Sequence, residues 1–583
     1  MHAQTRQDMY DVVIIGGGPG GATTGTLLKK YSPEMRVAIL EKERFPRDHV
    51  GESQLPPISR VLDEMGVWDK IEAAGFPIKI GATYTWGKTV DPWVFGFIPL
   101  SEVKVEPRPG RYDGWRQRTA FQVDRARYDE ILLRHAAACG CDVREGTQVR
   151  EVLHEGDRIT GVRLDDGTTI EGRYYIDSSG NAAVIRRQLG VRVDAPTLLR
   201  NVAFWDYWSA PGLNNPIYEN GTARVLIRSL PYGWLWYIAL SADRTSVGLV
   251  TPADYYKASG KRPEELYLAA LSQEQSVAHL LANAASRGRV ESTNDWSYVA
   301  ERTHGPNWFL VGESLGFADP ILAAGLTLTH TCARHCAYTI LEIERGNHDR
   351  DWLLRQYDDL QRRRVMQHMK FAEYWYSANG CFADIQENCT RIAQEAGLTL
   401  DPQEAFRWLS NGGIDDDIGQ VAIGGLDLAG IKGVQQRLSH ATDSGVKYKI
   451  DGKNTLKLNL IGAEKTFVAA LRAGRIERVE AYRRGPKTLI ATGVYGAVIE
   501  ALKKTSDVSR FNDLLRDLLG RRLGPADAPL AYRQAIQCLE VMVNDYWVLA
   551  TFKPGRPALS VSTPSEGELI YSEHLGPPSS RDR

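Results

Sequence analysis

The most chemically specific feature of the chain is a glycine-rich turn near its start. Gly16, Gly18 and Gly21 come at the end of an apolar run at residues 10–16, and a helical segment follows them. Glycines with this spacing permit a tight turn and let a pyrophosphate approach the helix N-terminus. Glu41 ends a second apolar run, where a carboxylate can accept hydrogen bonds from ribose hydroxyls. The spacing predicts a βαβ unit that binds a dinucleotide, either NAD or FAD.

A second feature is an aromatic stripe in the middle of the chain. Trp234, Trp236 and Ile238 alternate with other residues, so their side chains share one face of a predicted strand. Aromatic and β-branched residues are common in strands, and the stripe taken alone favours an ordinary sheet core.

A lysine among small residues is the third feature. If residues 78–86 form a strand, Lys79 shares one face with Gly81, Thr83 and Thr85. Small neighbours on that face would leave the ammonium in open space, where it could act on a bound molecule. The alternative is an exposed edge lysine, which is the commonest position for this residue type.

The overall composition narrows the class of protein. A chain of 583 residues predicts two or three domains. The net charge of −1 gives no basic surplus for nucleic acid, and no apolar run is long enough to predict a membrane span. The polar N-terminus does not have the pattern of a signal peptide. Seven scattered cysteines without zinc-finger spacing predict reduced thiols, no metal site and a cytoplasmic protein.

The pattern of elements changes along the chain. Residues 1–345 predict a Rossmann-like α/β domain with an inserted antiparallel sheet built from 83–120 and 195–300. Residues 346–583 predict a mainly helical region that covers the active site, with 412–433 as a loop. Helices are expected near 351–369, 463–473, 489–503, 509–519 and 528–550.

Together these features resemble the flavin-dependent halogenases. The stripe matches their W-x-W-x-I-P motif except that Ala239 replaces the proline, and residues 45–53 read F-P-R-D-H-V-G-E-S. The order of elements up to the helix near Gly325 is similar to that of FAD-dependent hydroxylases and halogenases. Glu313 stands where that group usually has aspartate. The implied fold is a hydroxylase-like flavoprotein that binds FAD.

The resemblance implies a reaction and roles for particular residues. Reduced FAD, O₂ and chloride or bromide would give hypohalous acid, and Lys79 would guide it to an electron-rich carbon. Trp234, Trp236 and Ile238 would shield the substrate from the flavin, and the backbone at Ala324 and Gly325 would bind halide. The implied FAD contacts are Gly16, Gly18, Gly21, Glu41, Arg44, Arg47, Ser53, Arg125, Val149, Glu313 and Asp319.

The resemblance also bears on substrate and partners. Leu322 stands where the tryptophan-halogenating branch has glutamate, which favours the branch acting on phenols, pyrroles or carrier-tethered acyl groups. With no second nucleotide-binding βαβ unit predicted, a separate flavin reductase is expected to supply reduced FAD.

Several alternatives stay open. Ala239 and Glu313 leave room for an FAD monooxygenase or flavin oxidase that diverged from halogenases, and a non-catalytic flavin-binding partner is a third possibility. For Arg44, Arg47 and Arg125, the alternative to contacts with the nucleotide is a set of ordinary surface salt bridges.

Overall fold

The protein divides into two units. The computed structural model describes residues 9–85, 92–98, 100–197, 200–210, 217, 220–377, 448–485 and 487–561. The first unit comprises Met1–Pro92, Val103–Ile392 and Ala473–Arg475, and the second comprises Trp93–Glu102, Ala393–Arg472 and Ile476–Arg583. The boundary expected after residue 345 therefore falls inside the first unit. Among the described residues no helix has the length and apolar character needed to cross a bilayer.

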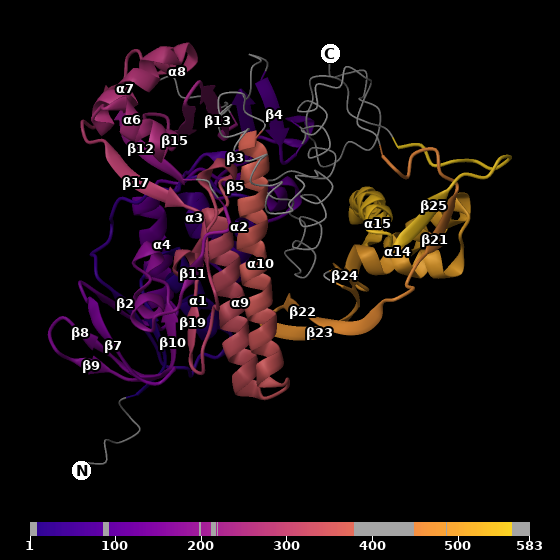
Figure 1. Ribbon diagram of the computed structural model, residues 1–583, viewed down its shortest axis with the longest axis horizontal. Helices are drawn as coiled ribbons and strands as arrows, with labels where there is room; N and C mark the ends of the chain where they lie inside the picture. The colour runs from indigo at the N-terminus through magenta and orange to yellow at the C-terminus, as the bar shows by residue number, and fades with distance from the viewer. Residues whose placement is uncertain are drawn as a thin grey trace. The chain divides into compact units, whose positions relative to one another are not determined.

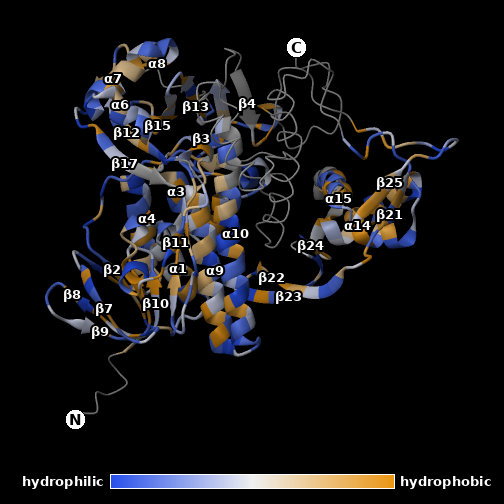
Figure 2. Ribbon diagram, in the orientation of Figure 1, coloured by the Kyte–Doolittle hydropathy of each residue, from blue (hydrophilic) through white to orange (hydrophobic). Residues whose placement is uncertain are grey.

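A parallel sheet forms the centre of the first unit (Figure 1). Its strands run in the order β19-β10-β1-β2-β6, and neighbouring strands are parallel. The strands are β1 (Tyr10–Ile15), β2 (Val37–Glu41), β6 (Asp142–Glu145), β10 (Gly172–Asp177) and β19 (Trp308–Leu310). β1 and β2 are largely apolar, as is typical of strands covered on both faces, and apolar ribbon is visible in this part of the fold in Figure 2. This arrangement confirms the Rossmann-like fold.

Helices and two small sheets surround the parallel sheet. The helices are α1 (Pro19–Tyr31), α2 (Pro57–Met65), α3 (Trp68–Ala73), α4 (Arg125–Ala138), α5 (Val184–Gln188), α9 (Gly325–Arg345) and α10 (Arg350–Ser377). The smaller strands are β7 (Val149–Glu155), β8 (Arg158–Leu164) and β9 (Thr169–Ile170), with β11 (Val193–Asp194), β18 (Tyr298–Ala300) and β20 (Gly316–Phe317) in a separate sheet.

A second, larger sheet is inserted into this fold. Its strands run in the order β16-β12-β15-β14-β13-β3, with β17 paired to β12 and β5 to β3. All these pairs are antiparallel except β13 with β3. The strands are β3 (Ile78–Thr85), β5 (Ala120–Phe121), β12 (Arg200–Ser209), β13 (Thr222–Leu230), β14 (Gly233–Ala239), β15 (Arg244–Pro252), β16 (Ala285–Ser286) and β17 (Glu291–Trp296).

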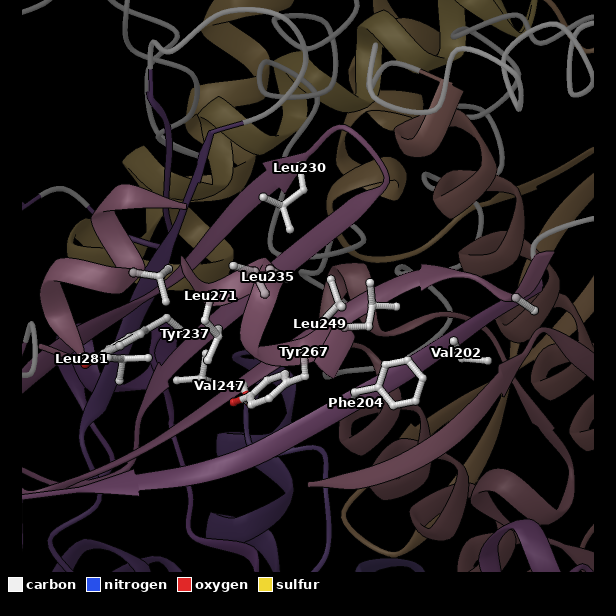
Figure 3. Close-up of a cluster of buried hydrophobic side chains, with 14 residues drawn as sticks. Val202, Phe204, Leu230, Leu235, Tyr237, Val247, Leu249, Tyr267, Leu271 and Leu281 are labelled. Atoms are coloured by element: carbon white, nitrogen blue, oxygen red, sulfur yellow. The ribbon is translucent and has the colours of Figure 1, made fainter. Parts of the chain in front are cut away.

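One face of the large sheet packs against three helices. Phe204, Leu235, Tyr237 and Leu249 extend from β12, β14 and β15 into a buried cluster with Tyr267 and its helical neighbours (Figure 3). The helices are α6 (Ala253–Ser259), α7 (Pro263–Gln273) and α8 (Gln275–Leu280). Because side chains alternate along a strand, Trp234, Trp236 and Ile238 lie on the opposite face.

A bulge in β3 changes the face on which Lys79 lies. In the pairing with β13, Lys79 is opposite Ala223 and Gly81 is opposite Arg224, so one residue of β3 has no partner. Gly81 has a φ of 156°, in the region that favours glycine. The expectation that Lys79 and Gly81 share a face is therefore wrong. Cross-strand partners share a face, which puts Lys79 with Tyr84, the partner of Ile227.

The second unit contains helices and strands. α14 (Gly493–Lys504) lies near its expected position, whereas the segments expected as separate helices at 509–519 and 528–550 form the single helix α15 (Val508–Asn544) followed by a strand. The prediction of a helix near 463–473 is wrong. This segment is the strand β22, along which more exposed and less exposed side chains alternate. The strands are β4 (Pro92–Gly96), β21 (Thr455–Leu458), β22 (Glu464–Arg472), β23 (Arg475–Arg484), β24 (Lys487–Ile490) and β25 (Val548–Thr551). The loop expected at 412–433 lies outside the described residues.

Candidate active site

The glycine turn has the geometry of a nucleotide cradle. Gly16 has a φ of 102°, and a Cβ on Gly21 would lie 1.9 Å from the carbonyl oxygen of Gly16. The backbone N–H of Gly17 donates to Glu41 Oε2 at 2.7 Å, and the N–H of Glu43 donates to Oε1 at 2.9 Å. Glu41 therefore holds the turn and its own strand end, and its oxygens have lone pairs left for a ribose.

An arginine lies against this turn. A Cβ on Gly18 would lie 3.3 Å from Arg47 Nη2, and Arg47 Nη1 is buried without a hydrogen-bond partner, 3.4 Å from Asp129 Oδ2. A guanidinium beside a glycine cradle, with one nitrogen that makes no hydrogen bond, suits a diphosphate. The residues present thus fit FAD at this end of the fold.

Arg125 and Arg44 are placed differently. Arg125 donates to both oxygens of Asp129, at 2.7 and 2.8 Å, and to the carbonyl of Val50 at 2.8 Å. Its guanidinium therefore ties α4 to the segment at residues 45–53. Arg44 is exposed and lies against Gly146. Val149 is buried at the start of β7.

A pocket lies where α9 begins. Its lining includes four residues that the sequence predicts to contact FAD or halide, namely Glu313, Asp319, Ala324 and Gly325. Ala324 is the N-cap of the 21-residue helix α9, and the first backbone N–H groups of a helix attract anions. Burial raises the pKa of Glu313, while the charge on Arg125 opposes that rise. The charge on Arg125 therefore partly offsets the desolvation of Glu313.

A chain of hydrogen bonds joins the tryptophan stripe to this pocket. Trp234 Nε1 donates to the Tyr376 hydroxyl at 2.9 Å, and that hydroxyl donates to Asp319 Oδ1 at 3.1 Å. The same oxygen accepts the backbone N–H of Ile321 at 2.8 Å. Burial raises the pKa of Asp319 to about 7. Tyr376 was not predicted, since nothing in the sequence of α10 marks it.

Lys79 is buried on the same face as the tryptophans. Its side chain is 2% exposed, and Nζ donates to the carbonyl oxygen of Gln54 at 2.8 Å. This burial excludes the exposed edge lysine, and it lowers the pKa of Lys79 to about 7. Tyr84, on the same face, donates to the carbonyl of Ile321 at 3.0 Å, and so joins β3 to the pocket loop. Trp236 fits against Gly248, where a Cβ would lie 2.1 Å from the indole ring.

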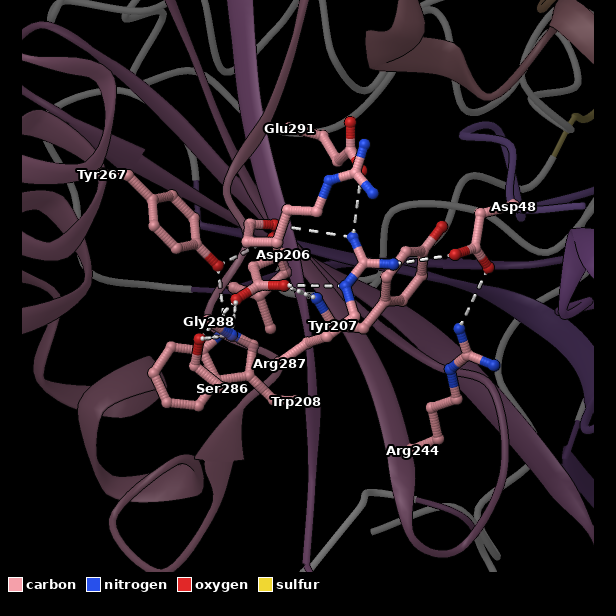
Figure 4. Close-up of polar contacts among 12 residues, drawn as sticks. Asp48, Asp206, Tyr207, Trp208, Arg244, Tyr267, Ser286, Arg287, Gly288 and Glu291 are labelled. Atoms are coloured by element: carbon pink, nitrogen blue, oxygen red, sulfur yellow. Dashed lines mark hydrogen bonds and ion pairs between the residues drawn. The ribbon is translucent and has the colours of Figure 1, made fainter.

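The segment at residues 45–53 is tied to the large sheet. Tyr207 donates to Glu52 Oε1 at 2.8 Å, and burial raises the pKa of Glu52. Arg287 lies between two carboxylates, 2.8 Å from Asp48 Oδ2 and 3.5 Å from Asp206 Oδ1 (Figure 4). Arg244 contacts Asp48 at 3.6 Å. These ion pairs hold the segment that leads to Gln54 and thereby to Lys79.

A buried histidine links three helices beneath the site. His330 on α9 contacts Thr23 Oγ1 through Nδ1 at 2.9 Å and the Tyr128 hydroxyl through Nε2 at 2.8 Å. Burial lowers the pKa of His330 to about 3, so it is neutral at ordinary pH. It fixes α1 and α4 relative to α9.

Comparisons with known proteins agree with this geometry. The family model described as Tryptophan halogenase matches residues 11–108 and 114–381. The chain is 31% identical over 346 residues to tryptophan 2-halogenase of Chondromyces crocatus, covering 58% of this chain and 62% of that protein. It is 30% identical over 386 residues to 1H-pyrrole-2-carbonyl peptidyl-carrier protein chlorinase of Pseudomonas fluorescens, covering 64% of this chain and 85% of that protein.

Solved structures show the same fold. The structure of the flavin-dependent halogenase CmlS has a TM-score of 0.70 at 23% identity, covering 96% of this chain and 99% of that one. The myxobacterial chondrochloren halogenase CndH, described as a variant of FAD-dependent halogenases, has a TM-score of 0.57 at 27% identity, covering 74% and 97%.

Proposed function

This chain belongs to the tryptophan halogenase family and is by family a flavin-dependent halogenase that uses FAD and halide, and from that premise we propose that Lys79 directs the oxidised halogen to an electron-rich carbon. The observation that carries the proposal is the position of Lys79, which is buried on the tryptophan face with an amine whose pKa is about 7.

The cofactor is held by the cradle described above. Gly16, Gly18 and Gly21 admit the diphosphate of FAD, Arg47 pairs with it, and Glu41 accepts from the ribose. Glu313 and Asp319, which line the pocket at the start of α9, would contact the flavin end of FAD, and Ala324 and Gly325 would offer backbone N–H groups to halide. When bound, reduced FAD and O₂ supply the two-electron oxidation that converts halide into hypohalous acid.

The protein's own groups then control that oxidant. The Lys79 ammonium donates a hydrogen bond to hypohalous acid and aims its halogen at the substrate carbon. As the carbon–halogen bond forms, the bond between halogen and oxygen breaks and water leaves with the proton of the carbon. Burial keeps bulk water away from the ammonium, which limits loss of the oxidant.

The tryptophan face separates substrate from flavin. Trp234 and Trp236 are 1% and 6% exposed, and Trp234 is fixed through Tyr376 to the pocket loop. A rigid wall of this kind favours halogen transfer over direct oxygen insertion. Tyr376 also supports the proposal that part of the region after residue 345 covers the active site.

The relatives suggest a substrate class and partners. Two relatives are named for a pyrrole-2-carbonyl group on a peptidyl-carrier protein, and they support an electron-rich aromatic substrate carried as a tethered acyl group. The relative from Chondromyces crocatus is instead named for tryptophan. We propose a secondary-metabolite precursor of this kind, with a separate flavin reductase supplying reduced FAD.

Lys79→Ala tests the proposal most directly. With reduced FAD, O₂, bromide and an electron-rich aromatic probe, halogenated product should fall by about 10²–10⁴-fold, as expected when a positioned catalytic group is lost. FAD binding and oxidation of reduced FAD should persist, because neither uses the ammonium. The exposed Lys42 provides the matched control Lys42→Ala.

Two results would contradict the proposal. Wild-type product formation by Lys79→Ala would remove the lysine from the mechanism. Hydroxylated product from the wild-type enzyme in excess bromide would replace halogenation with monooxygenation.

A further inference from the structure

Two hydroxyl groups near the start of α1 make no hydrogen bond in the part of the chain that the structure describes. They belong to Ser178, the residue after β10, and to Thr329 on α9. Both side chains lie against Gly20 in the first turn of α1, since a Cβ on Gly20 would lie 2.4 Å from Ser178 Oγ and 3.2 Å from Thr329 Cγ2. The two side chains therefore flank the helix that begins at the glycine cradle.

The order of the parallel strands places Ser178 on the expected path of FAD. The carboxyl ends of neighbouring parallel strands lie at one edge of a sheet, about 4.8 Å apart. Along that edge Glu41 ends β2, and Gly16 follows β1. Ser178 then follows β10, and Glu313 lies just beyond β19. A cofactor that reaches from Glu41 to Glu313 must cross the end of β10, where Ser178 is partly exposed.

Thr329 lies one step further along this path. It lines the pocket at the start of α9 together with Glu313, and a Cβ on Gly312 would lie 3.0 Å from its Oγ1. A threonine within a helix often donates to the carbonyl four residues earlier, as Thr331 does to Thr327 at 2.7 Å. Thr329 makes no such bond among the described residues, and its hydroxyl lies beside Gly312 instead.

Neutral hydroxyls suit the junction between a phosphate and a sugar chain. A hydroxyl donates to a phosphate oxygen, and it can either donate to or accept from a sugar hydroxyl. The acids at the two ends of the path, Glu41 and Glu313, would repel a phosphate if they stood in this place. Ser178 and Thr329 offer donors between them without adding charge.

We propose that Ser178 and Thr329 bind the part of FAD that joins its diphosphate to its flavin. The Ser178 hydroxyl donates to the phosphate that carries the ribityl chain, and the Thr329 hydroxyl bonds an oxygen of that chain. This role rests on the placement of FAD in the proposed function. It adds contacts from β10 and α9 to those of the βαβ unit.

Fragments of the cofactor test each contact separately. AMP has one phosphate, ADP adds the phosphate that in FAD carries the ribityl chain, and of the three only FAD has the chain itself. Ser178→Ala should raise the Kd of FAD and of ADP by about tenfold, as for a lost hydrogen bond to a charged group, and leave that of AMP unchanged. Thr329→Val should raise the Kd of FAD alone by about fivefold, as for a lost bond between neutral groups.

The dissociation constants are measured on the FAD-free enzyme, by quenching of flavin fluorescence for FAD and by titration calorimetry for AMP and ADP. Thr331→Val is the matched control, because it removes a hydroxyl of the same helix that donates to Thr327. This control should bind all three ligands as the wild-type enzyme does. Thr329→Ser retains the hydroxyl and should restore the affinity for FAD that Thr329→Val loses.

The outcomes separate this proposal from the proposed function. Unchanged affinity for FAD in Ser178→Ala and Thr329→Val would overturn the contacts even if the enzyme halogenates. An equal loss of AMP and ADP affinity in Ser178→Ala, or a loss of ADP affinity in Thr329→Val, would overturn the assignment of the hydroxyls along the cofactor. A wild-type enzyme that forms no halogenated product would contradict the proposed function, whereas the expected pattern of affinities would still establish the contacts.

Discussion

The two faces of the large sheet are made by the same strands yet differ in what they bury. Toward α6–α8, β14 presents Leu235 and Tyr237 to an apolar cluster. The other face presents Trp234, Trp236 and Ile238, together with a buried lysine. The apolar face is closed mainly by packing, with Tyr267 also donating to the carbonyl of Val247, whereas the tryptophan face is tied by hydrogen bonds to Asp319 and the loop before α9. Strand alternation therefore separates stability from chemistry within single strands.

The largest effect should come from the apolar face. Leu235→Ala removes a fully buried side chain, which typically lowers the free energy of unfolding by about 2–5 kcal/mol. Halogenation per folded molecule should stay at the wild-type level, because Leu235 points away from Lys79. Chemical denaturation and single-turnover product yield measure the two quantities. If the free energy of unfolding and the product yield per folded molecule fell together, the two faces would not have separate roles.

A substitution on the tryptophan face should instead lower halogenation more than stability. In Gly248→Val the new side chain would collide with the Trp236 ring, and displacing a group near the reaction by about 1 Å can cost about 100-fold in rate. We expect halogenated product to fall by that order and hydrogen peroxide release to rise. Unchanged coupling between flavin oxidation and halogenation would contradict the shielding role.

The pH dependence should follow Lys79. Burial lowers the pKa of Lys79 to about 7, so the ammonium is present below that pH and lost as the pH rises through it. Halogen transfer in a single turnover should fall by about tenfold between pH 6 and pH 8. Lys79→Arg, whose side chain stays charged, should not show this fall between pH 6 and pH 8. A rate that rises over this range would instead favour attack by the neutral amine.

The smallest effect should come from the hydroxyl that links the two regions. Tyr376→Phe removes the donor to Asp319 and the acceptor for Trp234, and should lower the free energy of unfolding by about 1–3 kcal/mol. The raised pKa of Asp319 means that its stability contribution is complete at acid pH and is lost as the pH rises through about 7. The hydrogen bond from Tyr376 favours the ionised form of Asp319, so the deficit of Tyr376→Phe should be larger at pH 8 than at pH 5.

A double-mutant cycle checks this link. Because Trp234 and Tyr376 share one hydrogen bond, Trp234→Phe and Tyr376→Phe together should cost less than the sum of the single changes. Additive costs would show that the stripe and the pocket loop are energetically independent.

Local patterns predicted part of this molecule, and distant contacts decided the rest. The glycine turn and Glu41 were predictable because their spacing is fixed by backbone geometry within one βαβ unit. The face of Lys79 was not, because strict alternation cannot anticipate a bulge at Gly81. Tyr376 was missed because its partner Asp319 lies 57 residues away and no motif marks either contact. The strand at 464–472 was not predicted, because its pairing with β23 stabilises it and the local sequence pattern does not reveal that pairing.

The unpartnered residue in β3 separates the length of the strand from the face on which its side chains lie. Deleting Ile80 would remove the bulge, but Lys79 would stay opposite Ala223 and Tyr84 opposite Ile227. Both side chains would therefore remain on the tryptophan face, and regular alternation would now put them there. A protein engineer could thus shorten β3 by one residue without moving the ammonium to the other face of the sheet.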